Sequence, residues 1–446
     1  MDILILGAGD IGFQLAKRLS FEKHNITIIE TNPKTAAYAR NHLDAFIIEG
    51  DAASWEILDS AQVRSADILA AITNSDEINL LACRIAKKVG VDVTIARVRN
   101  PEYTRPDYIL SREELGVDLI IQPEKEAAEA IVRLVRQSSA TDVIEFEEGR
   151  IQVIGIRLDA DCPVLDTKLM DIGKKYGNPP LRIIAIKRRQ RTIIPKGDDL
   201  LRNGDQVFIT CDPDFLQQGL AFFGKADTRV EDIMIIGGGM VGKFIARQLE
   251  KDINIKIIEM NEAKALQLAD DLTQSLVIHG DGSDIDLLNF EGISEMDEII
   301  SVTGDDETNI ITNLLAHHLR VPRTIALLKK MEYLSLTPAI GIDSVVSKQL
   351  ITVNAIEKFI RSRQIAFFAE IPGVDAEIIE FIPKENSRIT RKPLKDIKFP
   401  NNAILGAILK DNSKMVIPTG DTKIDAGDKV VVFSLPQSIK NLEKMF

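Results

Sequence analysis

Three glycines near the start of the chain have the spacing of a turn that binds phosphate. Gly7, Gly9 and Gly12 directly follow an apolar run, Ile3 to Leu6, that is typical of a buried strand. In such a turn the first glycine allows the sharp bend, the second lets a pyrophosphate approach the backbone, and the third lets helix and strand pack closely. The free N–H groups at the start of the next helix also favour a phosphate. The motif predicts a phosphate-binding segment of Gly7, Ala8, Gly9, Asp10 and Ile11.

An acidic residue stands where a dinucleotide site needs one. Glu30 follows the second apolar run, residues 26–29, about 20 residues beyond the glycines, where a carboxylate bonds the ribose of an adenine dinucleotide. The same charge repels a 2′-phosphate, so this position favours NAD over NADP. Arg97 ends the fifth expected strand and has two interpretations: a solvated side chain, or a charged fork that binds the pyrophosphate.

Three further residues at the same edge have two interpretations each. Asp51 follows the third expected strand, and it either caps the next segment or contacts the adenine end of the nucleotide. Thr73 and Asn74 end the fourth strand, where a bound dinucleotide would pass, and capping by Thr73, Asn74 or Ser75 is equally compatible with the sequence. The alternative for the whole motif is a sheet that needs tight turns and binds nothing.

The same pattern occurs a second time, about 230 residues later. Another strand and glycine turn are followed by an acid, a Gly-Asp pair and a threonine in matching order, so one half of the chain is a diverged copy of the other. Leu327 stands where the first copy has Arg97, and we therefore expect the two sites to differ in affinity or ligand. The second predicted site consists of Gly237, Gly238, Gly239, Met240, Val241, Glu259, Asp281 and Thr303.

The composition argues against several classes of partner. The chain has 446 residues and a formal net charge of −12, so it has no basic excess for nucleic acid or for anionic lipid. No apolar run approaches the ~18 residues of a membrane span, and we expect no secretory signal. The three cysteines are far apart in the sequence, which is typical of reduced cytosolic thiols.

No set of residues suggests catalysis or metal binding. The five histidines lack triad or metal-ligand spacing, and no serine or cysteine lies in a nucleophile elbow. A dehydrogenase needs a domain that supplies an acid–base group and a substrate pocket, and nothing after either glycine motif resembles one. We therefore expect no catalytic residues, no metal site and no enzymatic activity.

Strands and helices alternate over residues 1–122, which predicts an α/β domain with a parallel sheet. Residues 141–227 instead show short strands separated by turns, which predicts a small α+β module. The amphipathic helix expected over 124–137 either lies on its own domain or crosses to a partner subunit, and residues 349–361 repeat its apolar stripe. In the first domain we expect strands at 2–6, 26–29, 45–48, 67–72, 93–98 and 117–121, with helices beginning near Gly9, Pro33, Ser54, Ser75 and Arg105.

The duplication extends this organisation to the whole chain. Each half should contain a parallel-sheet nucleotide domain, a connecting helix and a small α+β domain. The predicted order is nucleotide domain 1–122, connecting helix 123–140, small domain 141–227, second nucleotide domain 229–348, second connecting helix 349–365 and second small domain 366–446.

The chain resembles the TrkA family of Trk-system potassium uptake proteins, which are cytosolic regulators of bacterial or archaeal potassium channels. The resemblance covers the whole chain and includes the internal duplication. The motifs that carry it are Gly7-Ala-Gly9-Asp-Ile-Gly12, Glu30, Gly50-Asp51, Thr73-x-Ser75-Asp76-Glu77-x-Asn79 and Ala96-Arg97-Val98-Arg99.

The resemblance implies Rossmann-like nucleotide domains of the RCK (regulator of potassium conductance) or KTN type, small regulatory domains, and binding of NAD(H). It also implies a homotetrameric ring on an integral membrane potassium channel or transporter subunit of the TrkH/TrkG type. The protein would then be cytoplasmic and peripheral on the inner face of the membrane. In this chain the family's nucleotide site would consist of the residues of the two predicted sites, and Leu327 departs from the family's arginine pattern in the second.

The sequence therefore favours a non-enzymatic regulator whose nucleotide prefers one arrangement of the assembly and so alters channel gating. One rival hypothesis is an NAD-dependent oxidoreductase, which turnover of NADH with a small carbonyl compound would support. The other is a sensor of ATP or ADP in the same cleft.

Overall fold

The structure is a computed structural model that describes residues 1–21, 24–146, 149–176, 181–189, 191–225, 229–334, 336–361, 367–370, 374, 376–410 and 414–446. The chain divides into two compact units. Unit 1 contains residues 1–127 and 348–359, and unit 2 contains residues 128–347 and 360–446. Among the described helices, none is both long enough and apolar enough to cross a membrane.

Unit 1 contains a six-stranded parallel sheet in the order β3-β2-β1-β4-β5-β6. The order reverses between β1 and β4, as in a doubly wound nucleotide-binding fold, so the predicted fold class is confirmed. Its central strands are buried along almost their whole length, because helices cover both faces. The elements are β1 Asp2–Leu6, α1 Asp10–Phe21, β2 Asn25–Glu30, α2 Pro33–His42, β3 Phe46–Glu49, α3 Trp55–Ser60, β4 Ile68–Ala71, α4 Asp76–Val89, β5 Val93–Arg97, α5 Arg112–Leu115 and β6 Leu119–Ile121.

The prediction of a helix that begins near Arg105 is wrong. A short 3-10 helix, η2 Pro101–Thr104, precedes that position, and the next α-helix is the four-residue α5. Pro106 disfavours helical backbone at the residue before it, so a helix cannot begin easily at Arg105. The helix begins instead after Ser111, which forms a reciprocal capping box with Glu114.

Unit 2 contains the second parallel sheet, in the order β14-β13-β12-β15-β16-β17. This is the same order as in the first sheet, so the duplication seen in the sequence is present in the topology. The elements are β12 Asp232–Ile236, α9 Met240–Leu249, β13 Asn254–Glu259, α10 Glu262–Asp271, β14 Leu276–His279, α11 Ile285–Phe290, β15 Glu298–Ser301, α12 Asp306–His318, β16 Arg323–Leu328, α13 Met331–Leu334, α14 Thr337–Ile340 and β17 Ser344–Ser347.

Unit 2 also contains two small antiparallel sheets of five strands each. One core cluster holds side chains from both sheets, including Phe146, Phe208, Ile378 and Phe433, and Thr210 Oγ1 donates to the carbonyl oxygen of Gly406 at 2.8 Å. The elements are β7 Asp142–Phe146, β8 Ile151–Arg157, α7 Leu169–Tyr176, β9 Leu181–Arg188, β10 Arg191–Ile193, β11 Gln206–Cys211 and α8 Leu216–Phe222, then β18 Phe367–Glu370, β19 Glu377–Phe381, β20 Ala403–Leu409, β21 Met415–Val416, β22 Lys429–Ser434 and α16 Ile439–Glu443.

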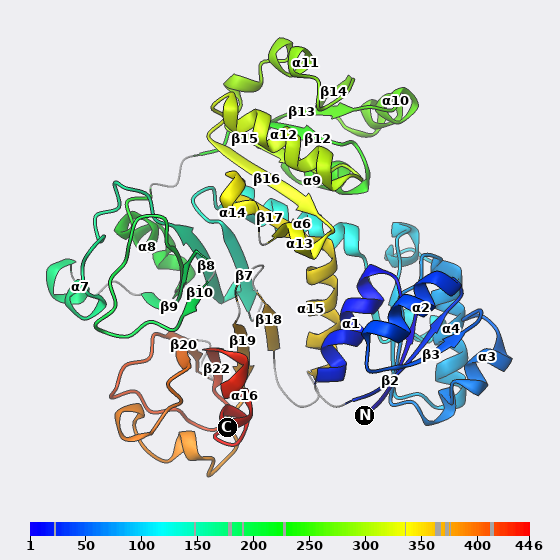
Figure 1. The fold of residues 1–446 in the computed structure, drawn as a ribbon, viewed down its shortest axis with the longest axis horizontal. Helices are drawn as coiled ribbons and strands as arrows, with labels where there is room; N and C mark the ends of the chain where they lie inside the picture. The colour runs from blue at the N-terminus through cyan, green and yellow to red at the C-terminus, as the bar shows by residue number, and fades with distance from the viewer. Residues whose placement is uncertain are drawn as a thin grey trace. The chain divides into compact units, whose positions relative to one another are not determined.

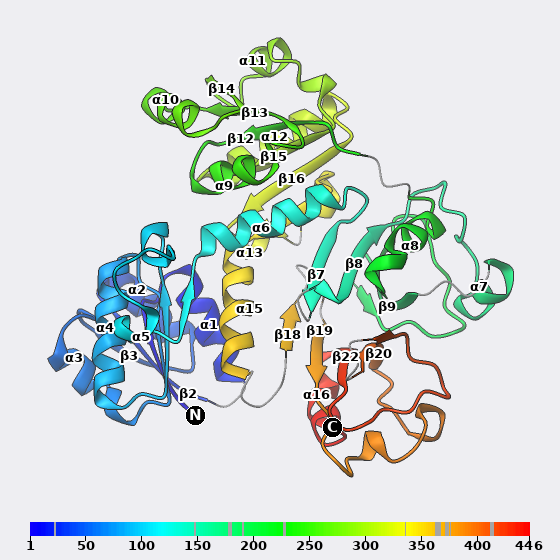
Figure 2. The same cartoon turned by 180° about the vertical axis from the view of Figure 1, so that it is seen from behind.

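Two long helices, α6 Pro123–Arg136 and α15 Lys348–Arg361, follow the first and the second parallel sheet in the sequence. Residues 348–359 of α15 belong to unit 1, where α15 lies beside α1 (Figures 1 and 2). Arg18 of α1 donates to Asn354 at 2.9 Å and pairs with Glu357 at 3.1 Å. Residues 128–136 of α6 belong to unit 2. Each helix therefore contributes to the unit that contains the other half's nucleotide sheet, within one chain.

Candidate nucleotide clefts

The first glycine turn has the backbone geometry that its spacing predicts. Gly7 has φ +96°, in the left-handed region, and a Cβ there would lie 3.2 Å from Thr73 Cα. A Cβ on Gly12 would lie 2.0 Å from the carbonyl oxygen of Gly7, so α1 approaches β1 more closely than any other residue allows. Gly9 has no heavy atom within 4 Å of its Cβ position. The turn therefore leaves open space at the glycine whose backbone a phosphate would approach.

Glu30 folds back onto this turn from the end of β2. Its Oε2 accepts a hydrogen bond from the backbone N–H of Ala8 at 2.7 Å, and its Oε1 accepts one from Asn32 at 2.8 Å. These bonds hold the turn in place. A carboxylate has about four acceptor positions, so Glu30 keeps acceptor capacity for a ribose hydroxyl.

Two residues that the sequence-based site omitted fix the edge of the sheet. Asn79 is fully buried on α4; its side chain accepts from the backbone N–H of Thr73 at 3.0 Å and donates to the carbonyl oxygen of Arg97 at 2.8 Å. Asp76 accepts the backbone N–H of Arg99 at 2.9 Å. Together they tie the end of β4 to the end of β5. The signal that could have found them is the Thr-x-x-Asp-Glu-x-Asn spacing, which occurs in both halves.

We expect Asn79→Leu to lower the free energy of unfolding by roughly 2–4 kcal/mol, because buried backbone groups of Thr73 and Arg97 lose their partners. The NADH affinity should fall as well, since the edge that carries Arg97 loosens. Urea unfolding and NADH titration measure the two effects. Asn309→Leu is the matched variant in the second half, where the same bonds occur. An unchanged urea midpoint for both variants would show that these bonds do not hold the edge.

Arg97 is buried, so its interpretation as a solvated side chain is wrong. Only 8% of the residue is exposed, and its Nη1 donates to Asn74 Oδ1 at 3.1 Å. Its Nε has no hydrogen-bond partner among the described residues. Burial lowers the pKa of Arg97, while the charges of Glu124, Asp76 and Asp10 favour its protonated form. Because Asp10 is the first residue of α1, the guanidinium lies within electrostatic reach of the glycine turn.

A second buried charge, Glu124, connects Arg97 to both long helices. Glu124 is the second residue of α6, and its Oε1 lies 3.0 Å from Nζ of Lys348, the first residue of α15. Burial acts to raise the pKa of Glu124, but Lys348 and Arg97 outweigh it and lower the pKa overall. In the second half, Gln349 is the second residue of α15, as Glu124 is of α6, and Leu327 stands in place of Arg97. The charges of Glu124 and Arg97 therefore both occur in the first half alone.

The first candidate site is called the first cleft below, and the corresponding site in the second half is called the second cleft. The other predicted residues of the first cleft contact their own loop. Asp51 Oδ1 accepts the backbone N–H two residues further on, at 2.9 Å, which forms a turn and not the cap of α3. The cap of α4 is Ser75, and the hydroxyl of Thr73 donates to Asn79. Asn74 is the partner of the arginine at the end of β5.

The second glycine turn repeats the geometry of the first. Gly237 has φ +109°, and a Cβ on Gly242 would lie 2.1 Å from the Gly237 carbonyl oxygen. Gly239, like its counterpart in the first turn, has no heavy atom within 4 Å of its Cβ position. Glu259 Oε2 accepts from the backbone N–H of Gly238 at 2.9 Å. Both halves therefore form the same turn, held by the same kind of acid.

The remaining predicted residues of the second cleft also occupy matching positions. Met240 and Val241 are the first two residues of α9, and Asp281 forms a turn by accepting from the backbone N–H of Ser283 at 2.8 Å. Thr303 follows β15, and its backbone N–H donates to Asn309 at 2.9 Å.

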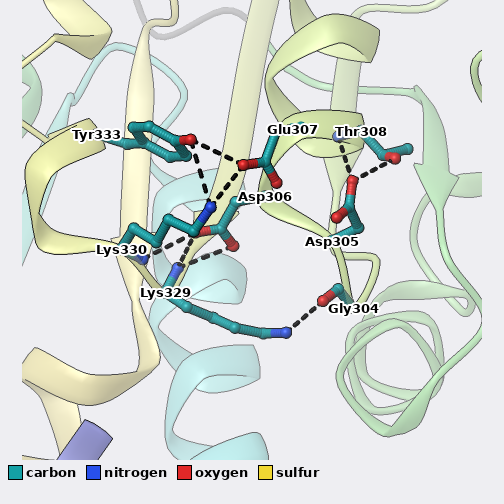
Figure 3. A network of polar contacts seen from close by, with 8 residues as sticks. All are labelled: Gly304, Asp305, Asp306, Glu307, Thr308, Lys329, Lys330 and Tyr333. Atoms are coloured by element: carbon teal, nitrogen blue, oxygen red, sulfur yellow. Dashed lines mark hydrogen bonds and ion pairs between the residues drawn. The ribbon is translucent and has the colours of Figure 1, made fainter.

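The second cleft differs in its charges. Leu327 is buried, with 5% exposed, and Gly304 replaces the asparagine that accepts from Arg97 in the first cleft. The amine of Lys329 donates to the carbonyl oxygen of Gly304 (Figure 3). The backbone N–H of Lys329 donates to Asp306 at 2.9 Å, which fixes the start of this side chain.

The neighbouring lysine has other partners. Lys330 Nζ lies 2.6 Å from Glu307 Oε1, and the hydroxyl of Tyr333 donates to the same oxygen at 2.8 Å (Figure 3). These bonds lower the pKa of Glu307 to about 2. Adjacent lysines therefore have different roles: Lys330 pairs with an acid, and Lys329 reaches a carbonyl oxygen at the carboxyl edge of the sheet.

Fold and cleft geometry define a class of protein: a tandem of two doubly wound nucleotide-binding folds, each followed in sequence by a small antiparallel domain. In the described part of the chain no cluster of three or more His, Cys, Asp or Glu residues could hold a metal ion. The family model of the TrkA-N domain matches residues 3–123 and 233–348, and that of the TrkA-C domain matches residues 153–224 and 378–446. The chain belongs to the TrkA family of Trk system potassium uptake proteins.

A curated relative covers the whole chain. The Trk system potassium uptake protein TrkA homolog 1 of Methanosarcina mazei is 35% identical over 455 aligned residues, with 100% of each chain covered. The resemblance inferred from the sequence is thus confirmed. The relatives of this chain are named as potassium uptake proteins, and as a member of that family this chain is not an enzyme.

Two solved structures show the same fold. The GsuK channel bound to NAD has a TM-score of 0.64 at 20% identity, over 100% of this chain and 78% of that chain. GsuK bound to ADP has a TM-score of 0.53 at 18% identity, over 81% of this chain and 70% of that chain.

Proposed function

We propose that this chain is the nucleotide-binding regulatory subunit of a Trk-type potassium uptake system. NAD(H) binds in the first cleft, and the bound nucleotide shifts the gating of a potassium channel or transporter subunit of the TrkH/TrkG type. Family membership supports the link to potassium uptake, and the NAD-bound GsuK channel supports the choice of ligand.

The observation that carries the proposal is the incomplete environment of Arg97. A buried guanidinium with an unbonded Nε is costly unless an anion completes its contacts. The open space at Gly9 provides a place for that anion, since the backbone there can be approached closely. A pyrophosphate bound between Gly9 and Arg97 would occupy the open space and give the guanidinium an anionic partner. The adjoining ribose would then donate to the remaining acceptor positions of Glu30.

The ligand would act on the connecting helices through Glu124. In the protein without nucleotide, the charge of Arg97 favours ionised Glu124, which also pairs with Lys348 at 3.0 Å. A pyrophosphate at Arg97 competes for the guanidinium and weakens the tie to Glu124. Because Glu124 lies in the first turn of α6 and Lys348 begins α15, the change reaches both long helices. Nucleotide binding then favours one arrangement of the assembly over another.

The experiment replaces two residues of the first cleft with their counterparts from the second cleft. Arg97→Leu with Asn74→Gly gives the first cleft the residues that Leu327 and Gly304 provide in the second. Hydrogen bonds to charged groups contribute about 1.5–3 kcal/mol, so we expect the NADH dissociation constant of the first cleft to rise about tenfold to a hundredfold. Calorimetric titration measures it, with Arg105→Leu as the control, because Arg105 is an exposed cation that pairs with Asp107. Equal affinities for wild type and the double variant would remove Arg97 from the site.

ATP or ADP is the second candidate ligand, because GsuK has been solved bound to ADP. The same titration with ATP and ADP distinguishes the candidates. A dinucleotide regulator should bind NADH more tightly than either mononucleotide in the first cleft, since two ribose–phosphate units contact the protein instead of one.

The expected assembly is a homotetramer, cytoplasmic and peripheral on the inner face of the membrane. A duplicated chain supports this proposal, because four copies can form a ring of eight similar nucleotide domains. The domain boundaries proposed from the sequence place the ring-forming nucleotide domains at 1–122 and 229–348. Light scattering of the purified protein measures the copy number.

A further inference from the structure

The two clefts carry a cation at equivalent places although their sequences differ there. In the first cleft, Arg97 donates to the side chain of Asn74. In the second, the amine of Lys329 donates to the carbonyl oxygen of Gly304, the residue that corresponds to Asn74 (Figure 3). By sequence Lys329 corresponds to Arg99, two positions beyond Arg97. Leu327 leaves the carboxyl edge of the second parallel sheet without the arginine that the first sheet has there. Lys329, two positions further along the chain, supplies a positive charge at that edge instead.

The backbone geometry explains how Lys329 reaches this edge. Asp306 accepts the backbone N–H groups of Lys329 at 2.9 Å and Lys330 at 2.8 Å, so the chain beyond β16 is held as it is in the first half. Gly304 has no heavy atom within 4 Å of its Cβ position, so no side chain blocks the path of the lysine. In the first half, Asn74 occupies the position that corresponds to Gly304.

The charges around Lys329 leave it available to an anion. No ion pair joins Lys329 to a carboxylate among the described residues; its amine has a carbonyl oxygen as partner. Lys330 is engaged by Glu307 and Tyr333 (Figure 3). An ammonium has three donors, so Lys329 can keep its bond to Gly304 and still contact a phosphate.

We propose that Lys329 is the phosphate-binding cation of the second cleft, and that this cleft binds the phosphate of an adenine nucleotide in spite of Leu327. The inference rests on the proposed function, because it assigns a ligand class to the second of its two clefts. A lysine is a compact charge on a flexible stem, whereas Arg97 is a planar fork held by burial. The second cleft should therefore discriminate less between mono- and dinucleotides than the first.

The experiment isolates the second cleft with Gly9→Asp, which places a carboxylate in the open phosphate position of the first. In this background ADP and NAD are titrated by calorimetry. Lys329→Met keeps the apolar stem and removes the amine, and we expect the ADP dissociation constant to rise at least about tenfold. Lys330→Met, one residue away, should change it less than about twofold. Adding Leu327→Arg and Gly304→Asn to Lys329→Met transplants the first cleft's pair and should restore binding.

The outcomes separate this inference from the proposed function. If Lys329→Met binds ADP as tightly as its background does, Lys329 is not the phosphate contact, while nucleotide binding by the second cleft stands. If the Gly9→Asp background binds neither ADP nor NAD, the second cleft takes no nucleotide and the inference fails. The proposed function is then judged on NADH binding by the first cleft in Gly239→Asp protein.

Discussion

Gly9→Asp is expected to abolish NADH binding in the first cleft without unfolding the protein. The Cβ position of Gly9 has no heavy atom within 4 Å, and its φ lies outside the left-handed region, so an aspartate fits the fold. Its carboxylate would stand where the pyrophosphate approaches the backbone. Like charges about 4 Å apart repel by about 4 kcal/mol at an effective dielectric constant near 20. We therefore expect at least a roughly hundredfold loss of affinity, measured by calorimetry.

Gly239→Asp is the matched variant, because the Cβ position of Gly239 is equally open. It should leave the first cleft's NADH affinity unchanged and remove nucleotide binding from the second. Thermal unfolding should show similar midpoints for wild type and both variants. If Gly9→Asp bound NADH like wild type, the phosphate would not lie at this turn, and the site proposed from the sequence would be misplaced.

Arg323→Met is expected to destabilise unit 2 by about 3–5 kcal/mol, because it leaves Glu298 as a buried charge without a counter-ion. Glu298 is 0% exposed, and Arg323 Nη1 lies 3.2 Å from its Oε1. The same arginine donates to the carbonyl oxygen of Leu134, in the last turn of α6, at 2.8 Å and to that of Ala140, beyond the helix, at 2.6 Å. The loss should appear as a lower urea midpoint for unit 2.

The loss should depend on pH. Burial raises the pKa of Glu298, and Arg323 opposes that rise. The folded state therefore holds a proton on Glu298 at pH values where the unfolded state has released it, so stability falls as pH rises above the ordinary pKa of the carboxyl group. Without Arg323 the folded pKa rises further, and the deficit of Arg323→Met should be larger at pH 8 than at pH 5.

The first half of the chain supplies the control. Ile68 and Val93 take the positions of Glu298 and Arg323, so Glu298→Ile with Arg323→Val copies an apolar pair that the fold already uses. This double variant should be more stable than Arg323→Met at pH 8, and its advantage should shrink toward pH 5, because it lacks the carboxyl group of Glu298. A double variant that is less stable than the single one would show that Glu298 is not the source of the penalty.

The sheets and the turns could be predicted from the sequence because their signals are local. Apolar runs followed by glycines define β1 and β12, and close helix packing at Gly12 and Gly242 requires glycine regardless of the surroundings. The role of Glu30 could likewise be predicted from its distance along the chain from the glycines. These features repeat in both halves, so each half supports the prediction made for the other.

Features that depend on contacts distant in sequence could not be predicted in the same way. The apolar stripe of α15 predicts that one face of the helix is buried, but not that Arg18, more than 300 residues away in sequence, contacts Asn354 and Glu357 of the same helix. Likewise, the sequence does not show that Arg97 donates to Asn74 and interacts with the charge of Glu124. Nor does Leu327 indicate that Lys329, two positions further on, reaches the same edge of the sheet. The periodicity of a sequence predicts which face of a helix is buried, but tertiary packing decides which other element contacts that helix.

The most direct test of the central claim is potassium flux into liposomes that contain a TrkH/TrkG-type membrane subunit, with and without this protein, as NADH is added. Our account predicts a flux that changes with NADH for the wild type and for Gly239→Asp, and that does not respond to NADH for Gly9→Asp. A flux that responds to NADH equally in the wild type and in Gly9→Asp would contradict the account.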